Sequence, residues 1–409
     1  MATSRTVIQE GIYINPAASS YTHQDKDKNT TSTSIYPTKI RSFHTSLPSF
    51  NKTPLHDVPA LATSLGVHRL LIKSESSRLG LPAFKILGAS WGVYRALCTE
   101  LGLTPDPEVT TLDLLKETVG SSQKQYVLFA ATDGNHGRAV ARMASIVLPE
   151  REVGGRAAIY VPKGMYETTK ELIEGEGADV VTVMGDYDAA VTECWDASEE
   201  LTRSGEGVGV MVQDNAFEGY ETVPGWIVEG YATLLAEVDE QYRELVGEDG
   251  KQITHVVTPI GVGSLGHAVV KWAKAASRKQ KVRVIACEPE TAACLHASLR
   301  AGRSTTIETI DTIMSGMCCG TVSPTSWEAL RDGLDSSVTV GDWECHESVL
   351  RLTGEYGIEA GPCGAGCLAG LSKALRSAEA REKLQLNKDS VVVVLSTEGK
   401  REYPVPEKL

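Results

Sequence analysis

The chain has 409 residues, 42% of them apolar, and its 40 basic and 53 acidic side chains give a net charge of −13. This length exceeds that of a single hydrophobic core, so two domains are expected, and the acidic excess argues against nucleic acid or an anionic membrane as a partner. No segment reaches the roughly 18–20 apolar residues that span a bilayer, the N-terminus lacks the apolar run of a secretory signal, and the nine cysteines show no C-x-x-C spacing, so a cytoplasmic protein with reduced thiols is predicted.

Residues 1–45 are polar and are predicted to form an arm that covers other parts of the protein. Beyond them, short runs of Val, Ile and Ala alternate with stretches whose apolar residues recur at helical spacing. This alternation predicts an α/β protein with mostly parallel strands that are buried on both faces. The predicted strands are 69–76, 125–132, 157–163, 178–185, 207–214, 255–261, 283–289 and 390–396, and the predicted helices are 88–102, 135–148, 168–177, 188–204 and a long run that ends near 245.

The residues that follow the predicted strands are the candidates for a ligand site, because ligands of open α/β sheets bind beyond the carboxyl ends of the strands. Together these segments supply a lysine in an apolar setting, two aspartates, two glycine-rich turns and a Ser/Thr pair. In chain order they read SESSRLGLPAFK, TDGNHG, QDNAFEGY, PIGVGSLG, EPETAAC and STEG.

The segment GVGSLG, residues 261–266, lies between a predicted strand and a predicted helix. Glycine lets the backbone approach an anion and the helix N-terminus supplies N–H donors, so the segment can hold a phosphate, although it can also be only a tight connection. A dinucleotide fingerprint fits the glycine spacing, with Glu288 at a tolerable distance for its acidic residue. The late position of the element in the chain disfavours an N-terminal nucleotide-binding domain.

Lys85 stands between Phe84 and Ile86 in LPAFKILGAS. A lysine in an apolar stretch can extend its ammonium group to solvent, whereas burial would lower its pKa and make it a competent amine nucleophile for a carbonyl cofactor. Asp133 in TDGNHG and Asp214 in QDNAF can cap helices or form turns, or they can take part in catalysis. Residue type and spacing leave these alternatives open.

Taken together, the segments resemble the fold-type II pyridoxal-phosphate enzymes, the tryptophan-synthase-β-like group, and within it the diaminopropionate ammonia-lyases. The resemblance implies two three-layer αβα domains with mostly parallel twisted sheets, and a homodimer. A large cofactor-binding domain would comprise residues 46–95 and 219–409, and a small mobile domain residues 96–218. The matching segments run in order from about residue 42 to 400 and read SESSRLGLPAFKILGAS, ATDGNHGRAVA, VPKG, MVQDNAFEGY, GWIVEGYATL, GVGSLG, CEPE, IMSGMCCG and LNKDSVVVVLSTEG.

The resemblance also implies a pyridoxal 5′-phosphate cofactor, bound by Lys85 as a Schiff base beside Phe84, and no metal. Asn135 resembles the residue that hydrogen-bonds the 3′ oxygen of the cofactor, and Ser396 resembles the hydroxyl that faces the pyridine nitrogen. A neutral hydroxyl there leaves the ring nitrogen largely unprotonated, which favours elimination over transamination. The backbone expected to bind the phosphate is that of Gly261, Val262, Gly263, Ser264, Leu265 and Gly266, and Glu288 is a further candidate for the cofactor site.

The two aspartates define the expected reaction. In diaminopropionate ammonia-lyases, residues matching Asp133 and Asp214 are the proposed bases for the D- and L-isomers, and abstraction of a proton from opposite faces requires a base on each face. The resemblance therefore implies α,β-elimination of 2,3-diaminopropionate to aminoacrylate and ammonia, followed by hydrolysis of aminoacrylate to pyruvate. Lys85 would return a proton to the leaving amine.

Departures from the family pattern leave the substrate open. The segment EAGPCGAG has Pro362 and Cys363 where the family usually shows an acid and a serine. A serine/threonine dehydratase, or another β-eliminating or β-replacing enzyme of the same fold, is therefore an alternative, and a pyridoxal-phosphate-binding protein without turnover is an alternative of another class. Cys294 and Cys319 match a pair that can form a disulfide in family members, but free thiols are favoured in a reducing cytosol.

Overall fold

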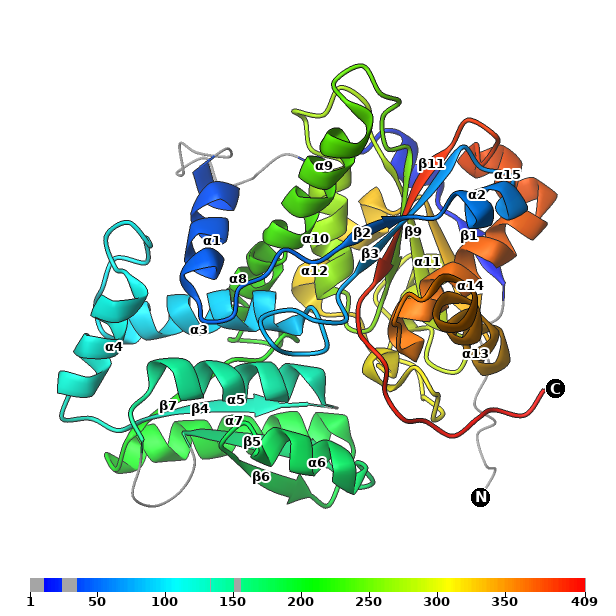
Figure 1. Ribbon diagram of the computed structural model, residues 1–409. Helices are drawn as coiled ribbons and strands as arrows, with labels where there is room; N and C mark the ends of the chain where they lie inside the picture. Colours follow the sequence, from blue (N-terminus) through cyan, green and yellow to red (C-terminus); the bar gives the residue numbers. More distant parts are fainter. Residues whose placement is uncertain (1–10, 24–34, 133, 151–155, 409) are drawn as a thin grey trace, which may run out of the picture.

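The computed structural model describes residues 11–23, 35–132, 134–150 and 156–408. Two β-sheets with helices packed against them organise the chain (Figure 1). Helix α3 (Lys85–Glu100) lies between the larger sheet, in the upper part of the view, and the smaller sheet below it. Within the described ranges, no helix is long and apolar enough to cross a membrane.

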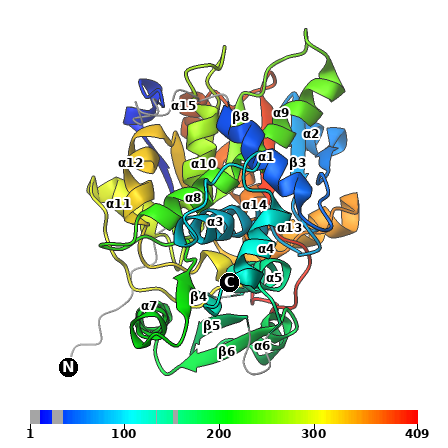
Figure 2. The same ribbon diagram turned by 90° about the vertical axis from the view of Figure 1, so that its left-hand side faces the viewer.

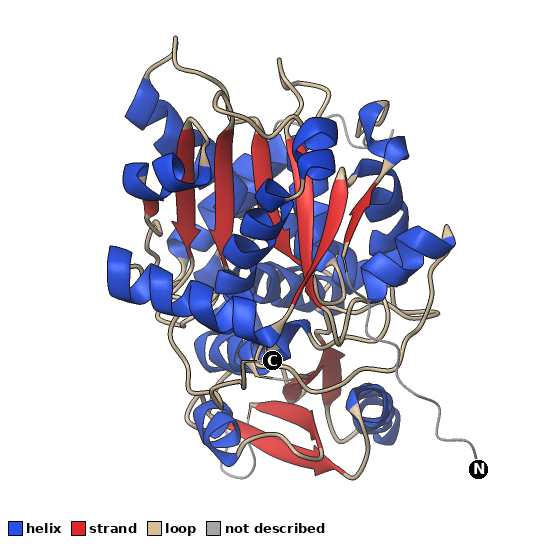
Figure 3. Ribbon diagram, turned by 90° about the vertical axis from the view of Figure 1, so that its right-hand side faces the viewer, coloured by secondary structure: helices blue, strands red, loops and turns tan. Residues whose placement is uncertain are grey.

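The larger sheet has the strand order β1-β10-β9-β8-β11-β3-β2. Its five inner strands are parallel, and each edge strand is antiparallel to its neighbour (Figure 3). Leu70 and Ile72 pack into the core on one face of this sheet, whereas Leu71 packs into the core on the other face. Burial on both faces explains the apolar runs of the sequence. The strands are β1 (Ile12–Ile14), β2 (Leu55–Asp57), β3 (Arg69–Ser74), β8 (His255–Pro259), β9 (Arg283–Pro289), β10 (Ser336–Val340) and β11 (Val391–Ser396).

The smaller sheet has the order β6-β5-β4-β7, and all of its strands are parallel. Leu128 and Ala130 of its strand β4 pack into the same core as the adjoining helix α5, whereas Val127 and Phe129 pack into a separate core with helix α7. This unit forms the lower part of the molecule in Figure 2. Its strands are β4 (Tyr126–Ala131), β5 (Ala157–Pro162), β6 (Ala178–Val183) and β7 (Val208–Met211).

Helices on both faces of each sheet complete the layered α/β architecture that the sequence predicts. The helices of the larger unit are α1 (Ile35–Ser46), α2 (Pro59–Leu65), α3, α8 (Thr222–Gly230), α9 (Ala232–Val246), α10 (Ser264–Ala273), α11 (Cys294–Ala301), α12 (Pro324–Gly333), α13 (Asp342–Leu350), α14 (Pro362–Arg376) and α15 (Ala378–Leu384). Those near the smaller sheet are α4 (Leu112–Ser121), α5 (Asn135–Val147), α6 (Glu167–Glu174) and α7 (Tyr187–Ser204), and short helical turns occur at η1 (Pro16–Ser19), η2 (Ser315–Met317) and η3 (Arg351–Glu355).

Two of the predicted segments, the N-terminal arm and the helix that ends near residue 245, differ from the structure. Helix α1 and strand β1 lie largely within the segment predicted as an arm, and both are integrated into the fold: Phe43 of α1 is 1% exposed, and β1 pairs with β10. The single long helix expected to end near 245 is two helices, α8 and α9, separated at Tyr231. The division into a large and a small mobile domain stays a prediction, although the strands of the smaller sheet all fall within residues 96–218.

A buried ionic network supports the segment that leads from β3 to α3. Arg78 donates to Glu75 and to Glu237, and Lys73 donates to Glu237, with all four side chains fully buried. Arg78 also exchanges two backbone hydrogen bonds with Leu81, at 2.7 and 2.9 Å. Because every charge in this network has an opposite partner, the network can remain ionised in the core while it fixes the segment that precedes Lys85.

Candidate active site

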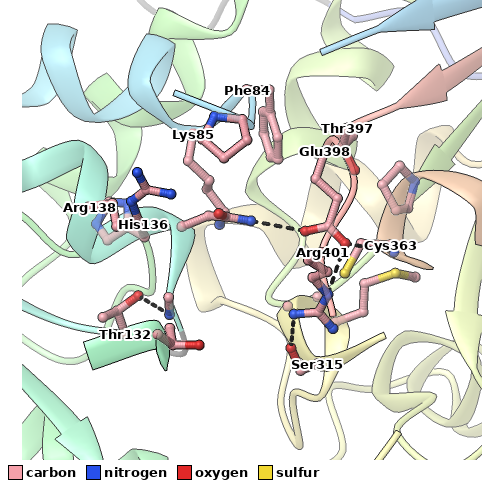
Figure 4. A pocket seen from close by; sticks show the side chains of 18 of the residues that line it. Phe84, Lys85, Thr132, His136, Arg138, Ser315, Cys363, Thr397, Glu398 and Arg401 are labelled. Carbon is pink, nitrogen blue, oxygen red and sulfur yellow. Dashed lines mark hydrogen bonds and ion pairs between the residues drawn. The ribbon is translucent and has the colours of Figure 1, made fainter. Parts of the chain in front are cut away.

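A cavity of about 680 Å³ is lined by residues from both units of the molecule (Figure 4). Its walls include the segments that follow β4, β7, β8 and β11, together with the N-termini of α3 and α14. These segments lie at the carboxyl ends of parallel strands, where α/β proteins bind their ligands.

Lys85 begins helix α3 and contacts Asp214, which follows strand β7 of the smaller sheet. The two side chains, 22% and 5% exposed, form a hydrogen-bonded ion pair. Burial opposes both charges, but each partner stabilises the other, so that the pKa of Lys85 is raised and that of Asp214 is lowered to about 2. The Lys85 ammonium lies 5.6 Å from the ring centroid of Phe84. Three predicted residues thus meet in the cavity, whereas Asp133 lies outside the described residues.

The glycine-rich segment from Gly261 to Leu265 lines the cavity between β8 and α10. Gly263 precedes the helix with φ +99°, in the left-handed region that favours glycine. A Cβ atom at Gly261 would lie 3.0 Å from the carbonyl oxygen of Gly316, so a larger residue would crowd the facing loop. The resulting helix N-terminus offers backbone N–H donors of the kind that bind phosphate.

Three residues predicted for the cofactor site, Gly266, Glu288 and Ser396, do not line this cavity. Gly266 faces the core of its own unit, where a Cβ atom would lie 2.3 Å from Cδ1 of Ile260. The carboxylate of Glu288 accepts the backbone N–H groups of Leu295 and His296, at 2.7 and 2.8 Å, in the first turn of α11. Glu288 therefore caps a helix in the structure, and Gly266 serves close packing.

Asn135 lines the cavity from the smaller unit, and Ser396 lies in the larger unit, adjacent in sequence to Thr397 of the cavity wall. Asn135 begins α5 and lines the cavity, and its Nδ2 donates to Glu398 at 3.0 Å. Ser396 ends β11, is fully buried, and has no hydrogen-bond partner for its hydroxyl within the described part of the chain. A buried hydroxyl without a partner costs about 1–3 kcal/mol, and Ser396 precedes Thr397 of the cavity wall, so a ligand atom that reached this hydroxyl would remove that cost.

Sequence reasoning did not single out the side chains contributed by the segment after β11. Glu398 and Arg401 both line the cavity. Glu398 accepts the backbone N–H of Cys363 at 3.0 Å, and Arg401 donates to the Ser315 hydroxyl at 2.7 Å. The motif STEG contains Glu398, but its hydrogen-bond donors Asn135 and Cys363 lie 263 and 35 residues away in the sequence, so no local pattern reveals them.

Two further cavity residues lie where the sequence drew attention without assigning a role. His136, next to Asn135, contacts the Val212 carbonyl oxygen through Nε2 at 2.8 Å, and burial lowers its pKa, which favours the neutral ring. Burial raises the pKa of the Cys363 thiol, which favours the protonated form. No disulfide joins the nine cysteines, Cys294 included, all of which lie within the described ranges.

These groups fit pyridoxal phosphate. Lys85 provides the amine, the segment that begins at Gly261 provides a phosphate-binding helix N-terminus, and Ser396 provides a buried hydroxyl that lacks a partner. Asn135 adds an amide donor on the cavity wall. The fit rests above all on the Lys85 amine and the glycine-rich segment, which line the same cavity, and the unpartnered Ser396 hydroxyl is adjacent in sequence to Thr397 of its wall.

Comparisons with known proteins agree with this assignment. Residues 47–398 match the family model described as pyridoxal-phosphate dependent enzyme. The diaminopropionate ammonia-lyase of Escherichia coli strain K12 is 34% identical over 367 residues, which cover 88% of this chain and 87% of that protein. The diaminopropionate ammonia-lyase of Salmonella typhimurium is 31% identical over 374 residues, 88% of each chain.

Solved structures give the same result. The crystal structure of the Escherichia coli enzyme in complex with D-serine has a TM-score of 0.82 at 30% identity, and the match covers 97% of this chain and 95% of that one. The structure of the same enzyme with an aminoacrylate-PLP azomethine reaction intermediate has a TM-score of 0.79 at 31% identity, with the same coverage. The predicted cofactor, the fold-type II architecture and the ammonia-lyase class are thereby confirmed. The chain belongs to the family of pyridoxal-phosphate-dependent enzymes, in which the diaminopropionate ammonia-lyases are its relatives.

Proposed function

We propose that the protein catalyses α,β-elimination of 2,3-diaminopropionate, producing ammonia and aminoacrylate, which hydrolyses to pyruvate and a second ammonia. The observation that carries this proposal is the contact between the Lys85 amine and the Asp214 carboxylate in the cavity. A cofactor-binding lysine with a base directly beside it is the arrangement that removal of an α-proton requires.

Pyridoxal phosphate, when bound, withdraws electrons from the α-carbon of an amino acid and thereby acidifies its α-hydrogen. Asp214 supplies the acceptor for that proton, because its carboxyl pKa of about 2 keeps it ionised at neutral pH. The Ser264 hydroxyl donates to the Asp214 backbone carbonyl at 2.8 Å, which holds the base against the phosphate-binding segment. Lys85, whose amine would hold the cofactor before substrate binds, would then donate a proton to the β-amino group, which leaves as ammonia.

The cavity also contains groups that suit a doubly aminated amino acid. The first turn of α5, which begins at Asn135, presents a helix N-terminus that can bind the substrate carboxylate. The carboxylates of Asp214 and Glu398 line the same cavity and would attract a β-ammonium group. Asp133, which precedes α5 in the sequence, is proposed as the base on the second face of the substrate.

A serine or threonine dehydratase is the second candidate. Cys363, which lines the cavity at the N-terminus of α14, replaces the serine usual in the family motif and changes the surface that a substrate would contact. A thiol offers a weaker hydrogen bond than a hydroxyl, so the preference between an amino and a hydroxyl leaving group has to be measured.

The test is pyruvate release by the cofactor-loaded protein from D- and L-2,3-diaminopropionate, with D- and L-serine and L-threonine in parallel. We expect fast turnover of at least one diaminopropionate isomer and slow turnover of the hydroxy amino acids. Lys85→Ala should abolish turnover, and Asp214→Asn should slow turnover of one isomer by about 10²–10⁴-fold.

Lys251 and Asp389 provide the matched control, because they form an exposed ion pair at 2.8 Å. Lys251→Ala and Asp389→Asn should retain the full rate. A preference for serine or threonine would transfer the protein to the dehydratases, and cofactor binding without turnover of any of these amino acids would indicate a binding protein.

We further propose that the enzyme is a cytoplasmic homodimer, as its resemblance to the fold-type II group implies. The absence of a disulfide among the nine described cysteines is compatible with a reducing compartment. Sedimentation equilibrium of the cofactor-loaded enzyme should give twice the chain mass of 43.9 kDa. A mass of one chain at all concentrations would contradict the dimer.

A further inference from the structure

The Glu398 carboxylate joins three segments that lie far apart in the sequence. It accepts hydrogen bonds from Asn135 Nδ2 and from the Cys363 backbone N–H, both at 3.0 Å, and Arg401 Nε lies 3.5 Å from it. Its side chain is only 5% exposed. Figure 4 shows Glu398 pointing into the cavity between the labelled Cys363 and Arg401.

The contact with Asn135 crosses between the two units of the molecule. Asn135 begins α5, which packs on the smaller sheet, whereas Glu398 follows β11 of the larger sheet. Within the described ranges, Glu398 is the carboxylate that accepts a hydrogen bond from the Asn135 side chain. The orientation of that amide is therefore set by a residue from the opposite unit.

An ionised carboxylate can only accept hydrogen bonds, so it decides which end of an amide faces it. With Nδ2 of Asn135 directed at Glu398, the amide oxygen is turned away and the second N–H remains available to another acceptor. The reversed amide would place two oxygens against each other and would lose that donor. Glu398 thus selects one of the two amide orientations.

A cation and a helix N-terminus flank the Glu398 carboxylate. Arg401 brings a positive charge, and its guanidinium is held in place by the Ser315 hydroxyl at 2.7 Å and by the Ile313 carbonyl. Cys363 lies in the first turn of α14, a helix of 15 residues whose N-terminus stabilises negative charge.

We propose that Glu398 is a positioning residue, which orients the Asn135 amide so that its free N–H faces the 3′ oxygen of the cofactor. The inference rests on the proposed role of Asn135 in cofactor binding and extends it to a residue that does not itself need to touch the cofactor. Loss of the carboxylate would let the amide reverse and would remove a donor from an ionised oxygen.

The test compares Glu398→Gln with the wild type in two measurements: the dissociation constant of pyridoxal phosphate, and the ratio of the absorption bands that report ionisation of the 3′ oxygen. Glutamine has nearly the same shape, but it can also donate to the amide oxygen of Asn135. We expect affinity to fall on the order of tenfold and the bands to shift toward the protonated form. Glu407→Gln removes the same charge from an exposed part of the same segment and should change neither.

Asn135→Ala and the double variant separate the possible causes. If Glu398 acts through Asn135, Glu398→Gln should have no further effect on the spectrum once Asn135 is alanine. Additive effects, or a wild-type spectrum for Glu398→Gln beside a shifted one for Asn135→Ala, would overturn the positioning role alone. An unchanged spectrum for Asn135→Ala would overturn the role of Asn135 as well, while diaminopropionate turnover remains the separate test of the proposed reaction.

A charge-swapped pair guards against a failure to fold. Asn135→Asp places two carboxylates in contact and should lower the melting temperature of the cofactor-free protein. Adding Glu398→Gln restores a donor and an acceptor to this contact and should recover the melting temperature. The absorption spectrum should stay shifted, because aspartate at position 135 has no N–H to offer the cofactor. Recovery of both properties, or of neither, would contradict the proposal.

Discussion

Glu237→Gln is expected to lower the free energy of unfolding by about 3–5 kcal/mol, the range found when one partner of a buried ion pair is removed. Glu237, on α9, contacts Lys73 Nζ and Arg78 Nη2 at 2.7 Å each, and the exposed fraction of all three side chains is 0%. Its other oxygen accepts Arg78 Nη1 at 2.8 Å. Substitution leaves two buried cations with Glu75 as the remaining carboxylate of the network.

Glutamine keeps one acceptor oxygen, but it replaces the other with an amide nitrogen that opposes a cation. The upper half of the range is therefore expected. Because Arg78 also fixes Leu81 through two backbone hydrogen bonds, the segment leading to Lys85 should loosen, and the affinity for pyridoxal phosphate should fall with stability. Urea unfolding of the cofactor-free protein measures the first effect, and cofactor titration measures the second.

The control is Glu240→Gln, one turn further along α9. Glu240 is 36% exposed and pairs with Arg41 and Lys52, so its removal should change stability by at most about 1 kcal/mol. A loss below about 1 kcal/mol for Glu237→Gln, or equal losses in the two variants, would refute the reasoning. Burial opposes ionisation of Glu237, but Arg78 and Lys73 outweigh it and lower its pKa from the ordinary 4.5. The stabilisation by ionised Glu237 is therefore fully present above pH 4.5 and is lost as pH falls through the lowered pKa. The difference in free energy of unfolding between wild type and variant should accordingly become smaller in acid.

Three further predictions concern the cavity. Ser396→Ala should leave the cofactor-free protein at least as stable, because its hydroxyl has no described partner, while weakening cofactor binding about tenfold in a spectrophotometric titration. Asp214→Asn should move the pH profile of cofactor loading, followed by stopped-flow absorbance, to lower pH, because Asp214 raises the pKa of Lys85 and only the neutral amine reacts; an unchanged profile would contradict this. Gly263→Ala should lower the free energy of unfolding by about 1–3 kcal/mol in urea, because the backbone has φ +99° and the new Cβ would lie 2.6 Å from Leu330 Cδ1. Gly225→Ala, where no atom lies within 4 Å of the new Cβ, should leave the free energy of unfolding unchanged.

Much of the fold follows from local sequence signals. Val391–Leu395 of β11 is a continuous apolar run, and all five residues are fully buried in the larger sheet, as such a run predicts. Strand β10 escapes the same reasoning because it begins with Ser336 and Ser337. Both serines are fully buried, and their hydroxyl groups donate hydrogen bonds to the Tyr13 carbonyl and to the Glu288 carboxylate, respectively. Partners so distant in sequence leave no local pattern.

In the candidate site, too, some residues have a local sequence pattern and others depend on partners that are distant in sequence. The surroundings of Lys85 and the glycines from Gly261 onward are local features, and sequence placed them in one site. Glu288 belongs to the CEPE segment that carries the family resemblance, but an acid near the end of a strand can equally cap the next helix, as Glu288 does on α11. Burial raises the pKa of the Glu288 carboxyl to about 7, although the hydrogen bonds from the backbone N–H groups of Leu295 and His296 act in the opposite direction. Glu398 was missed because its role arises only from assembly of the two units.

That assembly places functional groups directly at the junction between the units. Lys85 contacts Asp214, Ser264 donates to the Asp214 carbonyl at 2.8 Å, and Asn135 donates to Glu398, so each of these three contacts joins a residue of one unit to a residue of the other. A cofactor bound to Lys85 competes with the first of these contacts, whereas a cofactor that accepts the second N–H of Asn135 leaves the contact with Glu398 in place. Cofactor binding and the relative placement of the units are then thermodynamically linked, because any contact exchanged for a ligand contact alters the balance between the remaining ones. Substitutions at this junction should therefore change cofactor affinity even when the altered side chain touches no part of the cofactor.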